Sequence, residues 1–460
     1  METILQHFSR YFGMVKYEDL PAEVVDQAKI LTVDLMGVSI AGLKKDFPRI
    51  IIAYLMGLGG LRESTLLGTN KKIPAVFAAF GNGVSGHALD MDDGYRFGGV
   101  HTGVTVIPAA LACAEANKRD GKTFLLSVVL GFEIVNRLSK AINPSHLNRG
   151  FHTTGTIGVF GATAACGVSA GLNEAEMVSA LGMAGLQGAG LLEILNDGSM
   201  VKPIHPGKAG MAGILSVELA KRGARGPVTV LEGKDGFFKA MADKVALEGL
   251  FKDLGEHYSI CDQYVKFHAA CRHTHPAIDG LLAAMKESAL KFKDIETIDI
   301  ATYPVAINFC GKKTLPRTAE AAKFSLPYST AMAAYFGDLN EDRYTQAVIA
   351  NRDIQSLASR ISIRSEIKWE KAYPEQRGAT IIMKTKQGGM YTVEIPLAKG
   401  EPENRASVED IVSKFRQNAN WIGEKIIDEL LEGLFALDKR HVADLTKVMR
   451  RILPRKRKTP

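Results

Sequence analysis

The sequence predicts a mainly α protein in which a large all-helical domain carries an inserted, smaller α+β lid domain. Three observations support this class. Apolar residues recur at helical spacing through the first half of the chain, alternating β-branched segments begin near residue 293, and helical spacing returns from Ser407. We therefore expect a helical domain of residues 1–264 and 406–460. Residues 265–405 should form the lid, which closes over a pocket, because ligands often bind between domains.

Five segments of the first half have helical spacing, and several have recognisable ends. They are residues 26–42, 102–118, 123–140, 173–190 and 206–223. Asn173 followed by Glu176 is typical of a capping box, Pro206 suits a first helical turn, and Gly223 can end a helix. The N-terminal stretch lacks the basic start and continuous apolar core of a secretory signal, so we expect it to be a helix.

Strand signals are confined to the second half. Residues 295–303 alternate between apolar and polar types and are rich in β-branched side chains. Residues 379–385 and 390–395 form two further candidate strands, which are joined by the Gly-containing segment QGG. This spacing predicts a β-hairpin. The segment Ser407-Val-Glu-Asp410 then marks the start of the returning helices.

Composition excludes several function classes. The chain has 460 residues with 57 Lys and Arg against 50 Asp and Glu, and part of the excess is a basic run at its C-terminal end. This run comprises Arg450, Arg451, Arg455, Lys456, Arg457 and Lys458. No aromatic residues interleave with it, so we expect neither a nucleic-acid nor a membrane partner. The uncharged stretch 155–173 is rich in small residues, which suit closely packed helices. Five cysteines without C-x-x-C spacing favour a cytoplasmic protein without disulfides.

The stretch GHALDMDDGYRFGGVH, residues 86–101, concentrates polar groups that suit several kinds of site. The preceding GNGVSG matches a dinucleotide fingerprint in form, but it follows an Ala-rich helical segment and no acidic residue lies about 20 positions beyond it. Three aspartates and two histidines could bind a metal. They are His87, Asp90, Asp92, Asp93 and His101. The chain lacks the second acidic motif of prenyl-chain enzymes and any adjacent His-Asp pair, so we expect no metal.

Further cationic and imidazole groups gather in short motifs. Nine of the 11 histidines lie between residues 87 and 275, most of them beside Gly, Pro or Thr. The motifs are GFHTTG at His152, MVKPIHPGKAG at Lys202 and His205, and VKFHAACRHTHP at Lys266, His268, Arg272, His273 and His275. Lysines and protonated histidines can bind carboxylates, and histidines can move protons near neutral pH. These groups therefore suit proton chemistry next to a carboxylate.

The motifs HALDMDD, GFHTTGTIG, KPIHPG, KFHAACRHTHPAID and AAKFSLPYSTAMAAY resemble those of the MmgE/PrpD family, in order across about residues 10–440. That family includes 2-methylcitrate dehydratase, cis-aconitate decarboxylase and iminodisuccinate epimerase. The resemblance implies a helical domain with a smaller α+β lid, a homodimer, and no metal or organic cofactor.

The resemblance also implies a set of site residues. The catalytic candidates are Asp90, His101, His152, Lys202, Lys266 and Tyr328, and the substrate-binding candidates are Arg96, Lys202, Lys266, Arg272 and His273. The two lysines should bind carboxylates and thereby stabilise the charge of the transition state. His101 and His152 are the candidates for proton transfer, Asp90 should orient a neighbouring histidine, and Tyr328 should donate a hydrogen bond to the substrate.

Several of these residue types also have purely structural explanations. Asp92 and Asp93 suit helix caps or internal ion pairs, His87 and His205 suit scaffold positions, and Cys271 suits a small buried thiol. We expect that Lys202, just before a helix, has no buried partner in the empty protein and is therefore available to bind a substrate carboxylate. Its replacement by Met should then leave folding nearly unaffected.

The reaction type is left open by the sequence. Dehydration of a 2-methylcitrate-like hydroxy acid is the first expectation, with decarboxylation of an aconitate-like acid or epimerisation of a substituted succinate as alternatives. All three can begin from a bound carboxylate and an acidic C–H bond. The family commonly has Thr where Gly94 follows the aspartates here, and Arg96 adds a cation that fits a di- or tricarboxylate. A non-catalytic carboxylate-binding protein is the alternative from a different class.

Overall fold

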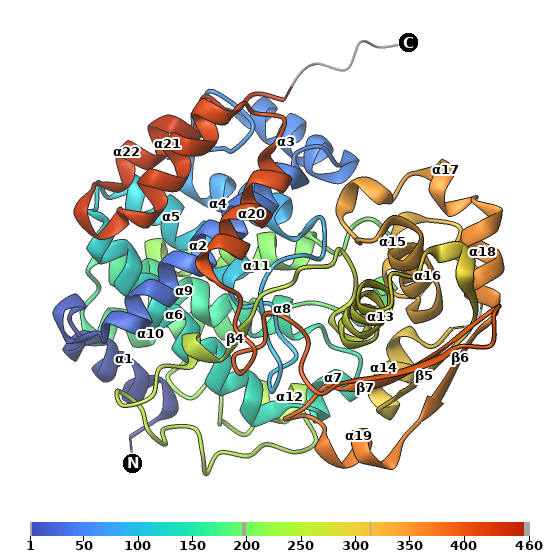
Figure 1. The fold of residues 1–460 in the computed structure, drawn as a ribbon. Coiled ribbons are helices and arrows are strands. Elements are labelled where there is room, and N and C mark those ends of the chain that lie inside the picture. Colours follow the sequence, from blue (N-terminus) through green and yellow to red (C-terminus); the bar gives the residue numbers. More distant parts are fainter. Residues whose placement is uncertain (1, 196–198, 313, 455–460) are drawn as a thin grey trace. The chain divides into compact units, whose positions relative to one another are not determined.

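The computed structural model describes residues 2–195, 199–312 and 314–454, and the chain divides into two compact units (Figure 1). Unit 1 combines the N-terminal segment up to Glu193 with Val201–Gln263 and the C-terminal segment from Ser407. Unit 2 is formed by Ile194–Met200 and Tyr264–Ala406. The mainly α class is confirmed. The basic residues Arg455, Lys456, Arg457 and Lys458 lie outside the described residues.

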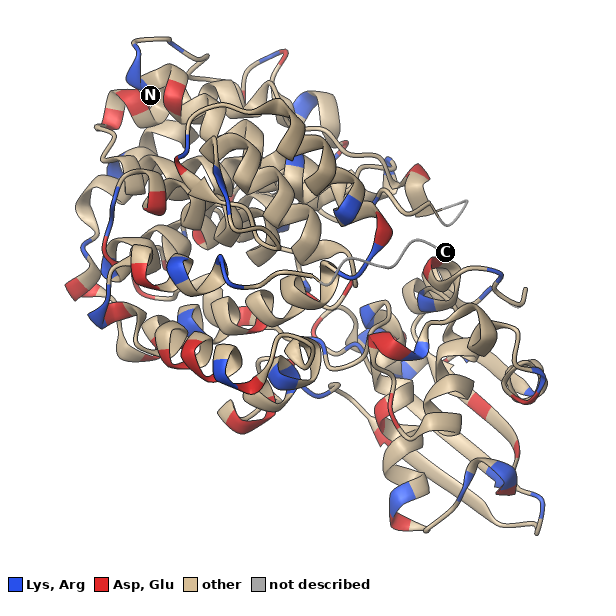
Figure 2. Cartoon of the chain, turned by 90° about the horizontal axis from the view of Figure 1, so that it is seen from above, with Lys and Arg blue, Asp and Glu red and all other residues tan. Residues whose placement is uncertain are grey.

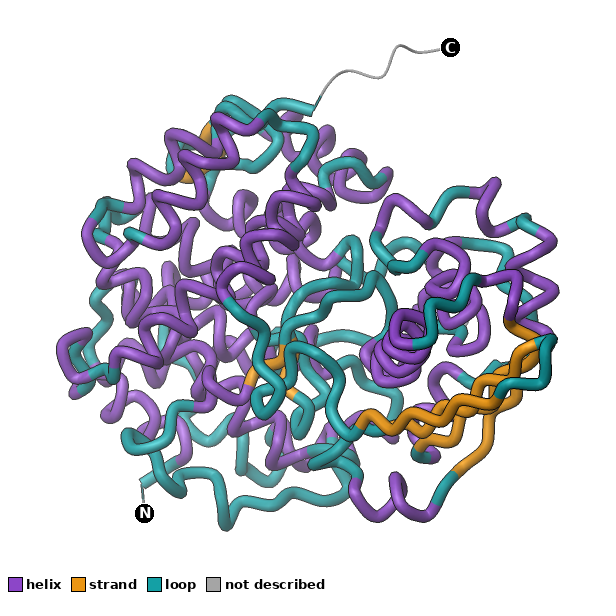
Figure 3. Tube along the Cα trace, in the orientation of Figure 1, coloured by secondary structure: helices purple, strands orange, loops and turns teal. Residues whose placement is uncertain are grey.

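Unit 1 is built mainly from helices, as the purple trace in Figure 3 shows. It also contains the two-residue strands β1 (Ser64–Thr65), β2 (Lys72–Ile73) and β3 (Gly94–Tyr95). Its longer helices are α1 (Ile4–Met14), α2 (Ala22–Gly42), α3 (Asp46–Leu58), α4 (Ala75–His87), α5 (Gly103–Ala116), α6 (Gly121–Ile142), α9 (Gly158–Ala170), α10 (Glu174–Gly185), α11 (Ile204–Lys221), α20 (Val408–Ala419), α21 (Glu424–Phe435) and α22 (Val442–Met449). Short helices α7 (Ser145–Asn148), α8 (Thr153–Thr156) and α12 (Phe237–Met241) lie in its connections. Among the described residues, no helix is both long and apolar enough to cross a membrane.

Local capping fixes several of these helix ends. Asn173 and Glu176 form the predicted capping box of α10, and Ser407 and Asp410 form the predicted one of α20. Gly223, with φ +89°, follows the C-terminal residue of α11 and its cap as expected. GNGVSG lies inside α4, so it provides no dinucleotide loop.

Small residues allow the central helices of unit 1 to approach closely. A Cβ atom at Gly83 of α4 would lie 3.0 Å from the Cα of Gly207 of α11, and one at Gly213 of α11 would lie 2.7 Å from the Cβ of Ala162 of α9. Figure 2 shows that charged residues are concentrated on the outer helices and loops of this unit. Close backbone contact therefore brings the C-terminal end of α4 near the N-terminal end of α11, where the candidate site lies.

The C-terminal segment returns to this centre through α20, which packs on α2. Lys414 of α20 forms a buried ion pair with Asp34 of α2 at 2.6 Å. Its ammonium group also donates to the carbonyl oxygen of Met91 at 3.0 Å. Lys414 thereby ties the loop after α4 to two helices that are distant in sequence.

Unit 2 contains one four-stranded sheet with the order β6-β5-β7-β8 (Figure 3). The strands are β5 (Ile295–Thr302), β6 (Ile361–Ser365), β7 (Ala379–Thr385) and β8 (Met390–Ile395). The predicted hairpin of β7 and β8 is confirmed, whereas β6, which pairs in parallel with β5, was not anticipated. The helices are α13 (His275–Glu287), α14 (Pro304–Cys310), α15 (Ala319–Lys323), α16 (Leu326–Phe336), α17 (Gln346–Ile349), α18 (Arg352–Ser359) and α19 (Ile367–Ala372).

The close helix contacts predict a marked difference between two Gly-to-Ala substitutions. In Gly213→Ala the new methyl group would lie within 3.0 Å of backbone atoms of Ala162 and Thr163. Overpacking of this kind should cost about 1–3 kcal/mol of the free energy of unfolding. Gly57→Ala, in the exposed part of α3, meets nothing within 4 Å and should stabilise by up to about 1 kcal/mol. Urea unfolding measures both. Equal effects would contradict the packing argument.

Candidate functional site

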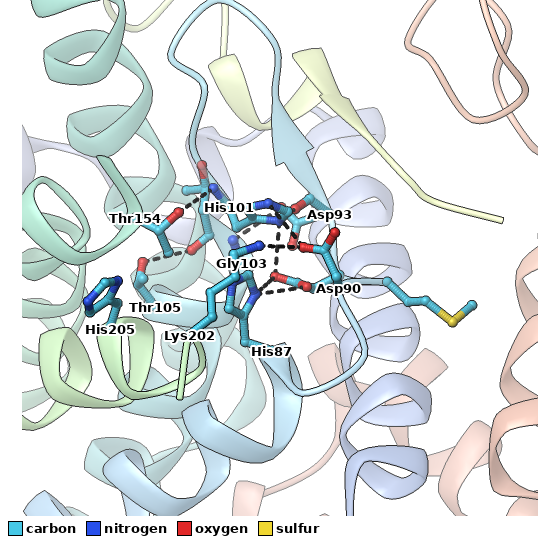
Figure 4. Close-up of polar contacts among 12 residues, drawn as sticks. His87, Asp90, Asp93, His101, Gly103, Thr105, Thr154, Lys202 and His205 are labelled. Atoms are coloured by element: carbon cyan, nitrogen blue, oxygen red, sulfur yellow. Dashed lines mark hydrogen bonds and ion pairs between the residues drawn. The ribbon is translucent and has the colours of Figure 1, made fainter. Parts of the chain in front are cut away.

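The candidate site lies where the loop after α4 meets the beginnings of α5, α8 and α11 (Figure 4). Asp90 in this loop has φ 56°, a left-handed conformation that Asp tolerates better than most residues. His101 precedes α5, His152 is the N-cap residue of α8, and Lys202 precedes α11. Four of the predicted catalytic residues therefore come together within unit 1.

Lys202 is bound to Asp90. The Lys202 Nζ atom lies 2.6 Å from Asp90 Oδ1, and the exposed fractions of the two side chains are 14% and 9%. Our expectation that Lys202 has no buried partner in the empty protein is therefore wrong. A substrate carboxylate would have to share this ammonium group with Asp90.

Asp92 connects two histidines beneath this pair. Its carboxylate oxygens lie 2.8 and 3.0 Å from His87 Nδ1, and Oδ2 lies 3.2 Å from His101 Nδ1. Burial by itself would raise the pKa of Asp92, but the two imidazoles hold it well below its ordinary value. Burial lowers the pKa of His87 to about 4 although Asp92 opposes this, and the charge of Lys202 lowers it further. Asp92 is therefore an anion that accepts from neutral His87.

The surroundings of His101 fix its tautomer. Its Nδ1 faces two oxygens that can only accept, the carbonyl oxygen of Asp93 at 2.9 Å and the carboxylate of Asp92. Nδ1 must therefore carry a proton, which leaves Nε2 for proton exchange. Nε2 lies 3.8 Å from Asp90 Oδ1. Asp92 thus orients this ring at Nδ1, and Asp90 faces Nε2. The orienting role that we expected of Asp90 is therefore shared with Asp92 at Nδ1 and stays a prediction for Nε2.

Asp93 is fully buried and interacts mainly with the backbone. Its Oδ2 accepts a hydrogen bond from the N–H of Gly103, the first residue of α5, at 3.1 Å. Burial and then the charge of Asp92 raise its pKa well above the ordinary value. A side chain at position 103 would collide with Asp93 Oδ1, because a Cβ there would lie 2.2 Å away. The helix-capping explanation that we considered for Asp93 therefore applies.

His152 and His205 form a second histidine pair. Their Nδ1 atoms lie 2.8 Å apart. His152 is 5% exposed and His205 is partly exposed. Burial, followed by the charge of Lys202, lowers the pKa of His152 well below its ordinary value and that of His205 to about 4. Both imidazoles are therefore neutral near pH 7.

Four of these residues have the donor atoms of a metal site. His87, Asp90, Asp92 and His101 each offer one atom, and these atoms lie within 4.8 Å of one another. However, the ammonium group of Lys202 already binds Asp90, and both histidines use Nδ1–H groups to bind oxygens. A metal would have to displace this ammonium group. Metal-independent chemistry stays our prediction.

Arg96 lies in a loop of unit 1 beyond the aspartates. The loop is closed by backbone hydrogen bonds between Tyr95 and Val100 and packs against Ser139 of α6 through Gly98. Arg96 is buried, and its guanidinium carbon lies 4.9 Å from the ring centre of Phe97. Its predicted contact with a substrate carboxylate stays a prediction.

The remaining predicted residues belong to unit 2. Lys266 is 1% exposed. Arg272 forms a buried ion pair with Glu401 at 2.8 Å and donates to carbonyl oxygens of the segment 398–399. Arg272 therefore holds this loop in place, and its part in substrate binding stays a prediction.

Two further unit 2 residues have internal hydrogen-bond partners. The Tyr328 hydroxyl lies 3.0 Å from the carbonyl oxygens of Val348 and Ile349, so it donates within the unit. His273 Nδ1 lies 2.6 Å from the hydroxyl oxygen of Tyr303. Their predicted contacts with a substrate stay predictions.

Sequence reasoning missed the parts played by Asp92, His205 and Lys414. Asp92 had been considered as a metal ligand, a helix cap or an internal ion-pair partner, and His205 as a scaffold residue. Lys414, in the middle of α20, had not been considered. The only available signal was proximity in sequence to stronger candidates, such as Asp92 beside Asp90.

Comparison with known sequences identifies related proteins. A sequence model of the MmgE/PrpD N-terminal domain matches residues 6–249, and one of the MmgE/PrpD C-terminal domain matches residues 268–432. Curated relatives include the cis-aconitate decarboxylase of Aspergillus terreus, 25% identical over 91% of this chain and 90% of its own length. The human and mouse cis-aconitate decarboxylases are 24% and 25% identical over 91% of this chain and 88% and 87% of their own lengths.

The Lys202–Asp90 pair predicts coupled effects on stability. Lys202→Met leaves Asp90 without this partner and should cost about 1–3 kcal/mol of the free energy of unfolding. The double variant Lys202→Met with Asp90→Asn should recover part of this loss, because neither position then carries a charge that has lost its partner. Urea unfolding of the two single variants and the double variant measures the coupling. Additive effects would mean that the pair contributes nothing to stability.

The raised pKa of Asp93 predicts a pH-dependent difference in stability. A carboxyl group whose pKa is higher in the folded state than in the unfolded state contributes to the stability of the folded protein. This contribution is complete at pH values below the unfolded-state pKa, and it is lost as the pH rises through the folded-state pKa. Asp93→Asn lacks that loss, so the variant should gain stability relative to the wild type as pH rises from 4 to 8. Urea unfolding across this range measures it. Asp235→Asn, at an exposed position, controls for the lost charge, and a pH-independent difference would contradict the assignment.

Proposed function

The chain belongs to the MmgE/PrpD family, and we propose that it is a lyase that decarboxylates cis-aconitate or a closely similar tricarboxylate. The observation that carries the proposal is the similarity, over about nine tenths of each chain, to cis-aconitate decarboxylases from a fungus and two mammals. Our first expectation from the sequence was dehydration of a 2-methylcitrate-like acid. The relatives favour decarboxylation, which was one of the two alternatives, beside epimerisation.

The geometry of the site is compatible with this chemistry. Loss of CO2 leaves the electrons of the broken C–C bond on carbon, and a neighbouring carboxylate helps to bear the negative charge. The Lys202 ammonium group, held by Asp90 in a mostly buried site, can stabilise that charge. A proton must then reach the carbon, and His101 and His152 are the groups that can deliver it.

The charges explain how a substrate can bind. Asp90 and Asp92 are the anions of the cluster, and Lys202 is the cation beside them. A tricarboxylate brings further negative charge, so it needs additional cations. We propose that Arg96 and Lys266 contribute to its binding, and that the active protein is a homodimer without a metal or organic cofactor.

A substrate panel tests the proposed reaction. The protein is incubated with cis-aconitate, citrate, 2-methylcitrate and substituted succinates in deuterated water, with and without EDTA. We expect CO2 release from cis-aconitate, one deuterium in the dicarboxylate product, and no effect of EDTA. Water loss from 2-methylcitrate without CO2 release would favour dehydration. Activity that EDTA abolishes and one divalent ion restores would return His87, Asp90, Asp92 and His101 to the role of metal ligands.

Lys202 variants test the role of its charge. Lys202→Met removes a charge-assisted contact and should lower kcat/KM by about 30-fold to 1000-fold, equivalent to about 2–4 kcal/mol. Lys202→Arg keeps the charge and should retain more activity. Thermal unfolding of both variants separates lost catalysis from lost structure. Wild-type turnover by a folded Lys202→Met protein would remove Lys202 from the mechanism.

A further inference from the structure

His152 and His205 are joined by a short hydrogen bond between two ring nitrogens. A separation of 2.8 Å between two Nδ1 atoms requires that one carries a proton and that the other offers a lone pair. Glycines make room for this arrangement. A Cβ at Gly155 would lie 3.0 Å from the Cβ of His205, and one at Gly190 would lie 3.4 Å from its Nδ1.

The two rings differ in their access to water. His152 is buried at the start of α8, where the charge of Lys202 acts on it and its ring centre lies 6.1 Å from that of His87. His205, on the first turn of α11, is partly exposed. The pair therefore connects the centre of the candidate site with the side of α11 that water can reach. Figure 4 shows His205 beside the polar cluster.

We propose that His205 and His152 act as a proton relay that supplies the proton consumed in each decarboxylation. This inference rests on the proposed function, because replacing a carboxylate by hydrogen consumes one proton per turnover, whereas dehydration does not. His152 is the group that meets the substrate, and His205 acts through it.

Three proton transfers make up the relay step. Before the step, His205 Nδ1–H donates to the lone pair of His152 Nδ1, and His152 carries its own proton on Nε2. The carbanion left by CO2 takes the Nε2 proton of His152. As that proton leaves, the Nδ1 proton of His205 moves to His152 Nδ1, and His205 Nε2 takes a proton from water. Both rings end neutral, with the Nδ1 proton now on His152, and the hydroxide left by water combines with the released CO2. Once the product has left, solvent protonates His152 Nε2, the Nδ1 proton returns to His205, and His205 Nε2 gives its proton to solvent, so each turnover consumes one proton.

Two variants of His205 distinguish a relay from simple positioning. In His205→Asn the amide can occupy nearly the place of Nδ1 and hydrogen-bond to His152, but it cannot pass a proton on. His205→Leu removes both properties. If the pair is a relay, both variants should lose about 10-fold to 100-fold in kcat with little change in KM. This is at or below the lower end of the usual effect of a positioned proton donor, because His152 itself is still present. If His205 only positions His152, the Asn variant should keep nearly wild-type kcat, and this outcome would overturn the proposal.

A second measurement examines the protonation step itself. Turnover in a mixture of H2O and D2O gives a product whose deuterium content reports this step, whether or not it limits the rate. We expect stronger discrimination against deuterium in the wild type, where two protons move together, than in His205→Asn. Equal discrimination would also overturn the relay. His257→Asn, which changes an exposed histidine paired with Asp262, serves as the control and should match the wild type.

The design separates failure of the relay from failure of the proposed function. A wild-type protein that releases no CO2 from any acid of the panel contradicts the proposed function. The Asn and Leu variants are then compared by the rate at which they exchange substrate hydrogen with deuterated water. Equal rates in the wild type and His205→Asn would overturn the relay for that chemistry as well.

Discussion

The site depends on one constraint, which is that three carboxylates from four consecutive residues are buried together. Counted as whole residues, Asp90, Asp92 and Asp93 are each no more than 6% exposed, and three ionised carboxylates so close together would repel one another strongly. Each is stabilised differently. Lys202 binds the first, two imidazoles donate to the second, and the third has a raised pKa and accepts from the N–H of Gly103. Because their partners differ, the three carboxylates of this cluster differ in their protonation properties.

Close packing of helices brings these partners within reach. Lys202 and Asp90 are 112 positions apart in the sequence, yet they meet because α4 and α11 approach each other at Gly83 and Gly207. Lys414 is 323 positions from Met91 but donates to its carbonyl oxygen. Glycines without obvious chemistry are therefore as necessary to the site as the charged residues, since a larger side chain would separate the helices that carry them.

The features that the sequence predicted well are those that depend on neighbouring residues. The capping boxes of α10 and α20 and the hairpin of β7 and β8 are confirmed, because caps and tight turns are determined within a few residues. Strand β6 was missed, since it is short and pairs in parallel with a strand distant in sequence. At the site, the sequence indicated Asp90, His101, His152 and Lys202 as chemically suitable. Their partners, including Asp92 and His205, follow only from tertiary structure.

The Asp90–Lys202 pair also bears on how the proposed enzyme would release its product. In the empty site the ammonium group is held by Asp90. The free energy that a substrate carboxylate gains by binding Lys202 is therefore only the difference between two similar ion pairs. This limits binding in the ground state but leaves the ammonium group positioned for charge that develops later, which is the requirement for catalysis. After CO2 has left and the carbon has been protonated, the retained carboxylate no longer bears the extra negative charge of the transition state, so the product competes less well with Asp90 for Lys202 than the transition state did. The same carboxylate that holds the lysine in place therefore favours departure of the product.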